Sequence, residues 1–231
     1  WEQMHQQGAD IIVAMDVSNS MLATDIKPNR LERAKHKVED LINMMQGDRI
    51  GLIAFAGTSF VQCPLTLDYN AATLFLDSLG VDLIPVQGTA LGHAITNAIG
   101  AFSQMEKKSK ALILITDGED HSGTAFTAAQ KAMEEGIKIF VIGIGSPDGV
   151  PIPDPQAGGG FKRDQNGEIV MSRLNESLLQ QIASETGGSY VRSVTGDLDL
   201  EKIYLDDIKE RVESKELKSN RRRIWQEQFQ W

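Results

Sequence analysis

The sequence predicts an α/β fold of three layers, in which helices cover both faces of a mainly parallel six-stranded sheet. Four apolar runs are nearly unbroken, at residues 10–15, 50–56, 111–116 and 137–143. Runs of that kind are typical of strands that are buried on both faces. Helical patterns lie between them, and a chain in which strands and helices alternate forms a doubly wound, Rossmann-like sheet.

Apolar residues recur at steps of three and four between the strands, as they do along one face of a helix. The clearest case begins at Leu31, after Pro28, and is closed by Gly47. Helices are expected at residues 31–45, 68–79, 88–105, 124–135, 175–186 and 197–217. The last helix should pack on the sheet through an apolar stripe made of Leu198, Leu205, Ile208 and Val212.

Three segments depart from the simple alternation. Residues 59–63 follow the preceding strand after a short turn, which leaves no room for a crossover, so this strand should be antiparallel and lie at an edge. Residues 146–173 are rich in Pro and Gly and predict an insertion. Within it, the pair Asn166-Gly167 is a strong hairpin-turn pattern, so a β-hairpin is expected there. The last strand of the sheet is expected at 189–192.

The composition is that of a globular chain, with 231 residues of which 41% are hydrophobic and 24% charged. A formal net charge of -9 argues against a nucleic-acid partner, because phosphate binding requires a basic face. Cys63 is the only cysteine, so an internal disulfide is impossible. No apolar run approaches the roughly 18 residues that are needed to span a bilayer.

We expect one domain at residues 9–217, with an N-terminal flank at 1–8 and a C-terminal flank at 218–231. The C-terminal flank combines three arginines with aromatic residues. That composition is found where a chain enters a bilayer interface, so the flank resembles a juxtamembrane segment. A frayed, solvated helix end explains the same residues equally well.

A cluster of small oxygen-bearing residues follows the first apolar run directly. Asp16, Ser18 and Ser20 are spaced two apart, and residues at that spacing in an extended segment project to the same side. Ligand sites of open parallel sheets gather at this end of the strands. Three hard oxygen donors suit Mg²⁺. Ordinary turn chemistry for Asp16 and helix capping by the two serines remain equally good explanations of these residues alone.

Two later residues favour the metal site. Asp117 follows the strand at 111–116, which should neighbour the first strand, and Thr89 opens the helix after Gly88. Both side chains are therefore expected at the same edge of the sheet. Thr89 as an N-cap and Asp117 as a turn residue are the alternatives.

The pattern Asp-x-Ser-x-Ser, a distant Thr and a later Thr-Asp-Gly resembles the metal-ion-dependent adhesion site (MIDAS) of von Willebrand factor A (VWA) domains, including integrin I domains. The resemblance covers roughly residues 9–192, and its one departure is Asn19, where the family often has Gly. It implies a site for Mg²⁺, or for Mn²⁺ or Ca²⁺, on Asp16, Ser18, Ser20, Thr89 and Asp117.

The resemblance also implies how the ion is held and what it does. Ser18 and Ser20 would bind it directly, Thr89 directly or through water, and Asp16 and Asp117 largely through waters. A Glu or Asp of a partner protein would fill the position that is left open. Residues expected around that position are Asn19, Met21, Gly88, Glu119 and Asp120. In the family the last helix can shift with the state of the ion, and such coupling is a hypothesis for 197–217.

Four segments resemble the Bat (aerotolerance) membrane proteins more narrowly. They are residues 16–23 (DVSNSMLA), 28–35 (PNRLERAK), 53–57 (IAFAG) and 87–92 (QGTALG). In that family the domain sits between transmembrane segments and is encoded beside an AAA-type ATPase. The resemblance implies a domain that is anchored to a bacterial inner membrane, on its periplasmic side, with other Bat proteins or the ATPase system as partners.

A non-enzymatic role is expected because no nucleophile or general base stands beside the site. His93 lies in a helical pattern and His121 on a polar loop. Three other functions are weaker hypotheses. A Mg²⁺-dependent phosphohydrolase would need a second Asp where Ser18 stands. Nucleotide binding is disfavoured because Gly143 and Gly145 are not followed by the third glycine of the dinucleotide fingerprint. A metal-independent scaffold that binds through the insertion is the remaining alternative.

Overall fold

The computed structural model of the protein describes residues 8–102, 109–120, 123–154, 158–193 and 198–209. Its centre is a six-stranded sheet of order β10-β5-β4-β1-β2-β3. Every neighbouring pair is parallel except β2 and β3, so β3 is an antiparallel edge strand, as predicted. The strands of this sheet are β1 (Asp10–Asp16), β2 (Arg49–Phe55), β3 (Ser59–Thr66), β4 (Lys110–Thr116), β5 (Ile137–Ile144) and β10 (Tyr190–Ser193).

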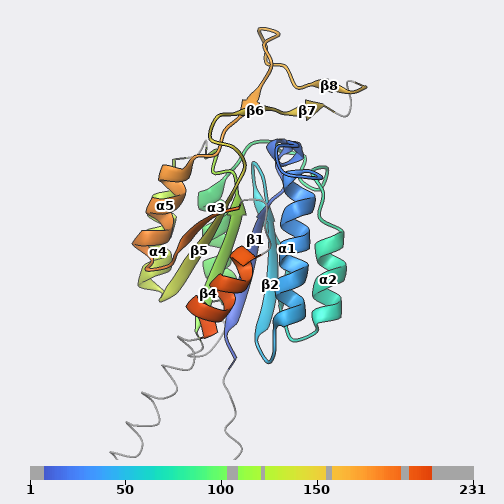
Figure 1. Cartoon of the computed structure of the whole chain (residues 1–231). Helices are drawn as coiled ribbons and strands as arrows, with labels where there is room; N and C mark the ends of the chain where they lie inside the picture. The colour runs from blue at the N-terminus through green and yellow to red at the C-terminus, as the bar shows by residue number, and fades with distance from the viewer. Residues whose placement is uncertain (1–7, 103–108, 121–122, 155–157, 194–197, 210–231) are drawn as a thin grey trace, which may run out of the picture.

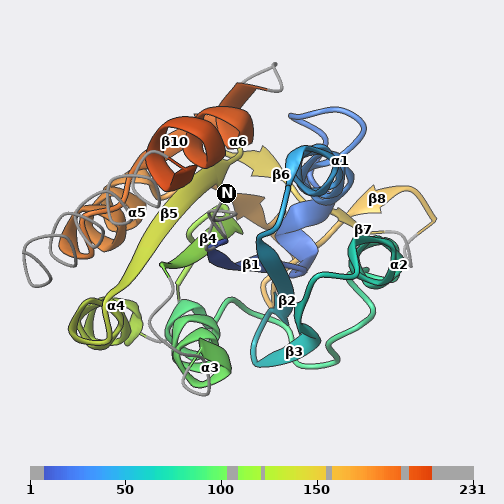
Figure 2. The same ribbon diagram turned by 90° about the horizontal axis from the view of Figure 1, so that it is seen from below.

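Helices cover both faces of the sheet, as the alternation of the sequence predicts (Figures 1 and 2). One buried apolar cluster joins the sheet to α1, α2 and the C-terminal helical segment, and a second joins it to α3, α4 and α5. The helices are α1 (Arg30–Met44), α2 (Tyr69–Asp77), α3 (Leu91–Phe102), α4 (Ala125–Glu134), α5 (Glu176–Glu185), α6 (Leu198–Lys202) and the π-helical η3 (Ile203–Lys209). The three-layer α/β fold is thus confirmed.

Side-chain caps fix where several helices begin. The side chains of Asn29, Asp68 and Asn175 accept hydrogen bonds from backbone N–H groups in the first turns of α1, α2 and α5. Such caps satisfy donors that a helix leaves free at its start. The residues just before the apolar stripes therefore set these three boundaries.

The start of α3 differs from the prediction. The helix begins at Leu91 instead of Gly88, because the N–H of Ala90 donates to the carbonyl of Ala56 at 2.7 Å. That bond ties Ala90 to the residue that follows β2. The first carbonyl that accepts a hydrogen bond from the helix is that of Ala90. Thr89 therefore precedes the helix and does not open it.

The apolar stripe expected on the last helix is also wrong in part. Leu205 is 45% exposed, whereas the buried residues of this segment are Leu200, Ile203, Tyr204 and Ile208. The π-helical hydrogen bonding from Ile203 onward changes the angular step between residues, so the buried face no longer follows the α-helical spacing. Val212 and the rest of the predicted helix lie outside the described residues, as do almost all of both predicted flanks.

The insertion stands at the carboxyl edge of the sheet, at the top of Figure 1. It contains two small antiparallel pairs, β6 (Val150–Pro151) with β9 (Met171–Ser172) and β7 (Pro153–Asp154) with β8 (Gly160–Phe161). The hairpin expected around Asn166-Gly167 is present as a single bridge between Arg163 and Ile169. The two regular pairings were not predicted: β6 and β9 lie at opposite ends of the insertion, whereas β7 and β8 follow each other closely.

A buried aspartate fastens the C-terminal helical segment to the body of the domain. Asp48 is 0% exposed, and its Oδ2 accepts a hydrogen bond of 2.6 Å from the hydroxyl of Tyr204. The same oxygen lies 2.8 Å from Nζ of Lys209. This carboxylate, at the amino end of β2, therefore holds η3 in place.

Among the helices of the described residues, none has the length and the apolar character that a membrane-spanning helix requires.

Removing the Tyr204 hydroxyl should loosen that attachment. We expect Tyr204→Phe to lower the free energy of unfolding by about 2 kcal/mol, because it removes a hydrogen bond to a buried charged group. Tyr69→Phe is the matched control, since Tyr69 donates to the backbone carbonyl of the same Asp48. That variant should lose only about 1 kcal/mol. Urea unfolding measures both, and equal losses would contradict the special role of the Tyr204 bond.

Candidate metal site

The two carboxylates that the sequence singles out lie on neighbouring strands. Asp16 is the last residue of β1, Asp117 follows β4, and β1 and β4 pair in parallel. Both residues are completely buried. Two acidic side chains are therefore enclosed together at the carboxyl end of the central strand pair.

Asp16 is held by two hydrogen bonds. Its Oδ1 accepts from the backbone N–H of Ser18 at 2.9 Å, and its Oδ2 accepts from the hydroxyl of Thr116 at 2.6 Å. The Thr116 hydroxyl in turn accepts from the N–H of Gly118 at 3.0 Å. Thr116 was not predicted as part of the site, although it is the Thr of the Thr-Asp-Gly pattern.

The two serines bring their hydroxyl groups together. Oγ of Ser18 lies 2.9 Å from Oγ of Ser20, and both residues are buried. A short 3₁₀ helix, η1 (Asn19–Leu22), begins after Ser18, but the Ser18 side chain makes no capping hydrogen bond with it. Helix capping therefore does not explain Ser18.

Thr89 belongs to the same edge of the sheet. The N–H of Val17 donates to the carbonyl of Phe55, and the N–H of Ala90 donates to that of Ala56, so the loops that carry Ser18 and Thr89 meet at the end of β2. Thr89 is buried, and within the described part of the chain its hydroxyl forms no hydrogen bond. A hydroxyl that no protein group occupies is available to a ligand.

Asp117 has a partner that the sequence did not reveal. Its Oδ2 accepts hydrogen bonds of 3.0 Å from Nη1 of Arg30 and from the hydroxyl of Ser172. Its Oδ1 accepts only a longer bond, of 3.3 Å, from the N–H of Glu119. Arg30 is completely buried and also forms a two-bond ion pair with Asp25, with both distances 2.9 Å. Arg30 lies in the stretch PNRLERAK, but nothing in its spacing pointed to Asp117.

The surroundings shift the proton affinity of these acids. Burial, and then the negative charge of Asp117, raise the pKa of Asp16 to about 7, against hydrogen bonds from Ser18 and Thr116 that lower it. Burial and Asp117 also raise the pKa of Glu119. At Asp25, burial opposes the charge and hydrogen bonds of Arg30, which prevail and lower the pKa. Burial and repulsion by Asp117 disfavour the ionised form of Asp16. A bound cation would stabilise that form, so the pair favours cation binding.

The donor set fits a hard divalent cation. Oxygen atoms from two carboxylates and three hydroxyls are the ligands that Mg²⁺ and its neighbours prefer. Within the ranges that the structure describes, no group of three or more His, Cys, Asp or Glu side chains is placed to hold a metal ion. Any cation held here would therefore depend on the hydroxyl groups.

Comparison with known proteins identifies the family to which the fold belongs. The von Willebrand factor type A domain family matches residues 11–119. The structure of the conserved hypothetical protein BatB from Bacteroides thetaiotaomicron superposes with a TM-score of 0.84 at 40% identity, over 90% of this chain and 100% of that one. The chain belongs to the von Willebrand factor type A domain family.

Two further solved structures resemble this chain. An aerotolerance-related membrane protein from Bacteroides fragilis is 42% identical, with a TM-score of 0.82, over 86% of this chain and 98% of that one. Proximal thread matrix protein 1 of the mussel byssus, solved with a zinc-occupied MIDAS motif, is 21% identical, with a TM-score of 0.64, over 89% and 46% of the two chains. It therefore shares the fold alone. The chain spans about 60% of the length of a curated relative from Borreliella burgdorferi.

The residues expected around the open position do not all lie there. Met21 is completely buried in the core beside α1 and is a packing residue, so its assignment to the rim is wrong. Glu119 is partly buried and accepts a hydrogen bond of 2.7 Å from the N–H of Arg173. Asn19, Gly88 and Asp120 are partly exposed at this edge. Glu119 thus helps to hold the insertion, while His121 lies outside the described residues.

Packing explains the two glycines at the carboxyl end of β5, of which Gly143 lies in the strand and Gly145 follows it. A Cβ on Gly143 would lie 2.5 Å from the hydroxyl of Tyr190, and one on Gly145 would lie 2.7 Å from Cζ of Arg30. Gly145 also has φ +134, a conformation that side chains disfavour. The glycines make room for neighbours, which further weakens the nucleotide-binding alternative.

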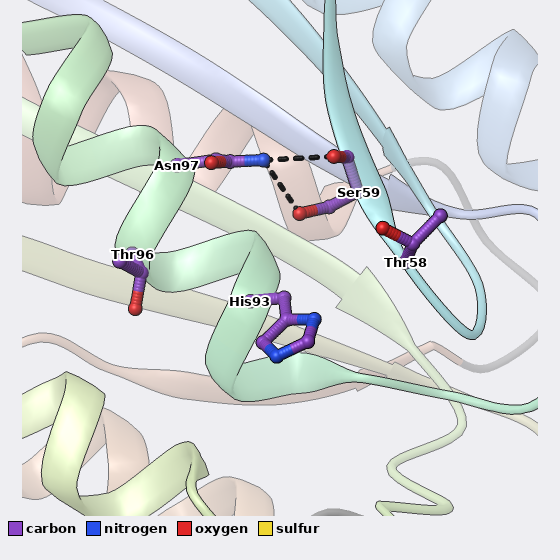
Figure 3. A pocket seen from close by; sticks show the side chains of 5 residues that line it. All are labelled: Thr58, Ser59, His93, Thr96 and Asn97. Carbon is purple, nitrogen blue, oxygen red and sulfur yellow. Dashed lines mark hydrogen bonds between the residues drawn. The ribbon is translucent and has the colours of Figure 1, made fainter.

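A small polar pocket lies beside the site, not in it. It has a volume of about 210 Å³ and lies between α3 and the turn from β2 to β3 (Figure 3). Its lining residues are Thr58, Ser59, His93, Thr96 and Asn97. The Asn97 amide donates to both the carbonyl and the hydroxyl of Ser59, so its side chain is fixed. None of the five predicted ligands lines this pocket.

Substituting Gly145 should disturb Arg30. We expect Gly145→Ala to lower the free energy of unfolding by about 3 kcal/mol, because the new methyl group combines backbone strain with a clash against the guanidinium. Gly136→Ala is the matched control, since Gly136 has φ +70 with no atom within 4 Å of the added Cβ. Strain alone should take about 1 kcal/mol there. Equal losses of stability in urea unfolding would show that the Arg30 guanidinium moves away from the new methyl group at little energetic cost.

The raised pKa of Asp16 predicts a pH dependence of stability without metal. The folded protein keeps a proton on Asp16 up to about pH 7, whereas the unfolded chain loses it near its ordinary value of 3.8. Stability from this group is complete below 3.8 and is lost as the pH rises through 7. In EDTA, the melting temperature of Asp16→Asn should therefore rise relative to wild type between about pH 4 and pH 7, the span of these two values, and level off above it.

Differential scanning fluorimetry of the two proteins, at matched pH and ionic strength, isolates Asp16 because all other titrating groups are shared. Excess Mg²⁺ should abolish the relative loss in the wild type, since a cation stabilises the ionised carboxylate. A constant difference between the proteins across the pH range would mean that Asp16 ionises normally.

Proposed function

We propose that this VWA domain binds a divalent cation through Asp16, Ser18, Ser20, Thr89 and Asp117, and that the ion binds a carboxylate of a partner protein. The observation that carries the proposal is the convergence of three hydroxyls and two buried acids, from three separate segments of the chain, at one edge of the sheet. Mg²⁺ is the expected ion, with Mn²⁺ or Ca²⁺ as alternatives.

The hydrogen bonding supports a division of labour among the five residues. Ser18, Ser20 and Thr89 contribute uncharged hydroxyl groups, so they are the proposed direct ligands. Both oxygens of Asp16 and of Asp117 already accept hydrogen bonds, which favours contact through water. When bound, the ion supplies a Lewis-acid position for one more oxygen ligand.

An anionic oxygen is the proposed ligand at that position. Hydroxyl ligands carry no charge, and Arg30 neutralises part of the charge of Asp117, so an ion held here would keep much of its positive charge. A partner's Glu or Asp would then bind in the same way as a salt bridge. The zinc-occupied MIDAS motif of the mussel byssus protein supports occupancy of such sites in this fold.

Anchoring to a bacterial inner membrane is part of the proposal. It rests on similarity to the aerotolerance-related membrane protein from Bacteroides fragilis. We place the domain on the periplasmic side, with other Bat proteins or an AAA-type ATPase system as its partners. These assignments extend the family resemblance to the full-length relatives, of which this chain matches only a part.

Two alternatives remain distinguishable from adhesion. A metal-independent scaffold would bind its partner through the insertion, whose Phe161, Ile169 and Met171 are exposed apolar residues. A phosphohydrolase would use Asp16 as a nucleophile, but Asp16 is fully buried and hydrogen-bonded at both oxygens. Binding without catalysis is therefore the function that we propose.

Loss of a serine hydroxyl tests the metal site directly. We expect wild-type protein to bind Mn²⁺, detected as loss of the free-ion electron paramagnetic resonance signal. Ser18→Ala should bind it about 100-fold more weakly, because loss of a direct ligand should cost at least as much as the loss of an outer-shell partner. Ser193→Ala is the matched control, because Ser193 is buried to the same extent, 3% exposed, and its hydroxyl has no hydrogen-bond partner among the residues that the structure describes. The control should bind Mn²⁺ like the wild type.

The partner is tested by capture from native membranes with Mg²⁺ and with EDTA, comparing wild type, Ser18→Ala and Ser193→Ala. Adhesion requires a partner that is retained only with Mg²⁺ and only by the wild type and Ser193→Ala. Retention that ignores both EDTA and Ser18→Ala favours the scaffold. Hydrolysis of phosphate esters that is lost in Asp16→Ala would instead establish the enzyme.

A further inference from the structure

The most unusual side chain near the proposed metal site is a fully buried arginine. Arg30, the first residue of α1, is 0% exposed. Its Nε and Nη2 donate to the two oxygens of Asp25, and its Nη1 donates to Oδ2 of Asp117 and, at 2.6 Å, to Oγ of Ser172. One guanidinium therefore connects the loop after η1, the end of β4 and the insertion.

Such a cluster is stable only as a unit. Burying an isolated charge costs several kcal/mol, and removing one member leaves its partners uncompensated. Only the planar fork of a guanidinium reaches two carboxylates and a hydroxyl at once, because its donors point in fixed and separate directions. A lysine at position 30 would keep the charge and lose that geometry. The shape of Arg30, and not its charge alone, thus determines where Asp117 stands.

The cluster also holds both ends of the insertion. The N–H of Ser146 donates to Oδ2 of Asp25 at 2.8 Å, and the hydroxyl of Ser172 donates to Asp117. Next along the chain, the N–H of Arg173 donates to Glu119, and that of Asn175 donates to the carbonyl of Asp117. The stem of the insertion is therefore built onto the residues around Asp117.

We infer that Arg30 is a positioning residue of the metal site, acting together with Ser172. The two side chains occupy Oδ2 of Asp117 and so turn Oδ1, which has one long hydrogen bond, toward the cation. The same contacts fix the stem of the insertion beside the ion. This inference rests on the proposed function, because it concerns the ion that Asp117 helps to hold.

Mn²⁺ affinity in charge-preserving variants tests the inference. Arg30→Lys and Ser172→Ala should each bind Mn²⁺ at least about tenfold more weakly than the wild-type domain, as loss of an outer-shell partner does. Ser172→Ala keeps the Arg30–Asp25 pair, so it serves if Arg30→Lys does not fold.

The matched control for the arginine is Arg49→Lys. Arg49 forms a two-bond pair with buried Asp10, with both distances 2.7 Å, at the opposite end of β1. Arg49→Lys should lower the melting temperature without changing Mn²⁺ affinity. Ser193→Ala should change neither the melting temperature nor the affinity.

Unchanged Mn²⁺ affinity in Arg30→Lys and Ser172→Ala, with normal binding by the wild type, would overturn the positioning role and leave the metal site intact. Affinity lowered equally by Arg49→Lys would also overturn it, since the effect would then follow from stability. No Mn²⁺ binding by the wild type would overturn the proposed metal site and this inference together.

Discussion

The enclosure of two acids at the end of the central strand pair is the constraint on which this edge of the molecule depends. Asp16 and Asp117 are both fully buried, and the burial of two like charges is strongly unfavourable unless donors or cations compensate them. The compensation comes from different elements: Thr116 of β4, the loop before η1, Arg30 of α1 and Ser172 of the insertion. The loops at this edge are therefore arranged around the two carboxylates.

The rigid sheet makes that arrangement possible. The strands β1, β2, β4 and β5 are buried almost throughout, with apolar clusters against both faces, so the ends of the strands cannot move independently. Parallel pairing in register brings the end of β1 beside the end of β4. Small polar side chains placed just beyond these ends acquire fixed positions, although they lie in loops.

The insertion is more than an appendage of the fold. Its chain leaves β5 past Gly145, which leaves room for Arg30, and returns at Ser172 to bond Asp117. Because Asp25 holds one end of the insertion, and Asp117 and Glu119 hold the other, the insertion is fixed at the edge of the sheet where the proposed metal site lies. A partner that bound an ion at the proposed site would therefore approach this element.

The sequence by itself determined the sheet, its antiparallel edge strand and the edge where the site lies, because uninterrupted apolar runs and short connections leave few alternatives. It also selected Asp16, Ser18, Ser20, Thr89 and Asp117, whose grouping follows from strand order. Tertiary structure alone decided that Met21 is buried, that Leu205 is exposed and that Arg30 binds Asp117. Local periodicity describes one element at a time. The contacts of Arg30, in contrast, join α1 to Asp117, 87 positions along the chain, and to Ser172, 142 positions along. Their cause is the need of buried charges for partners, which only the folded chain can supply.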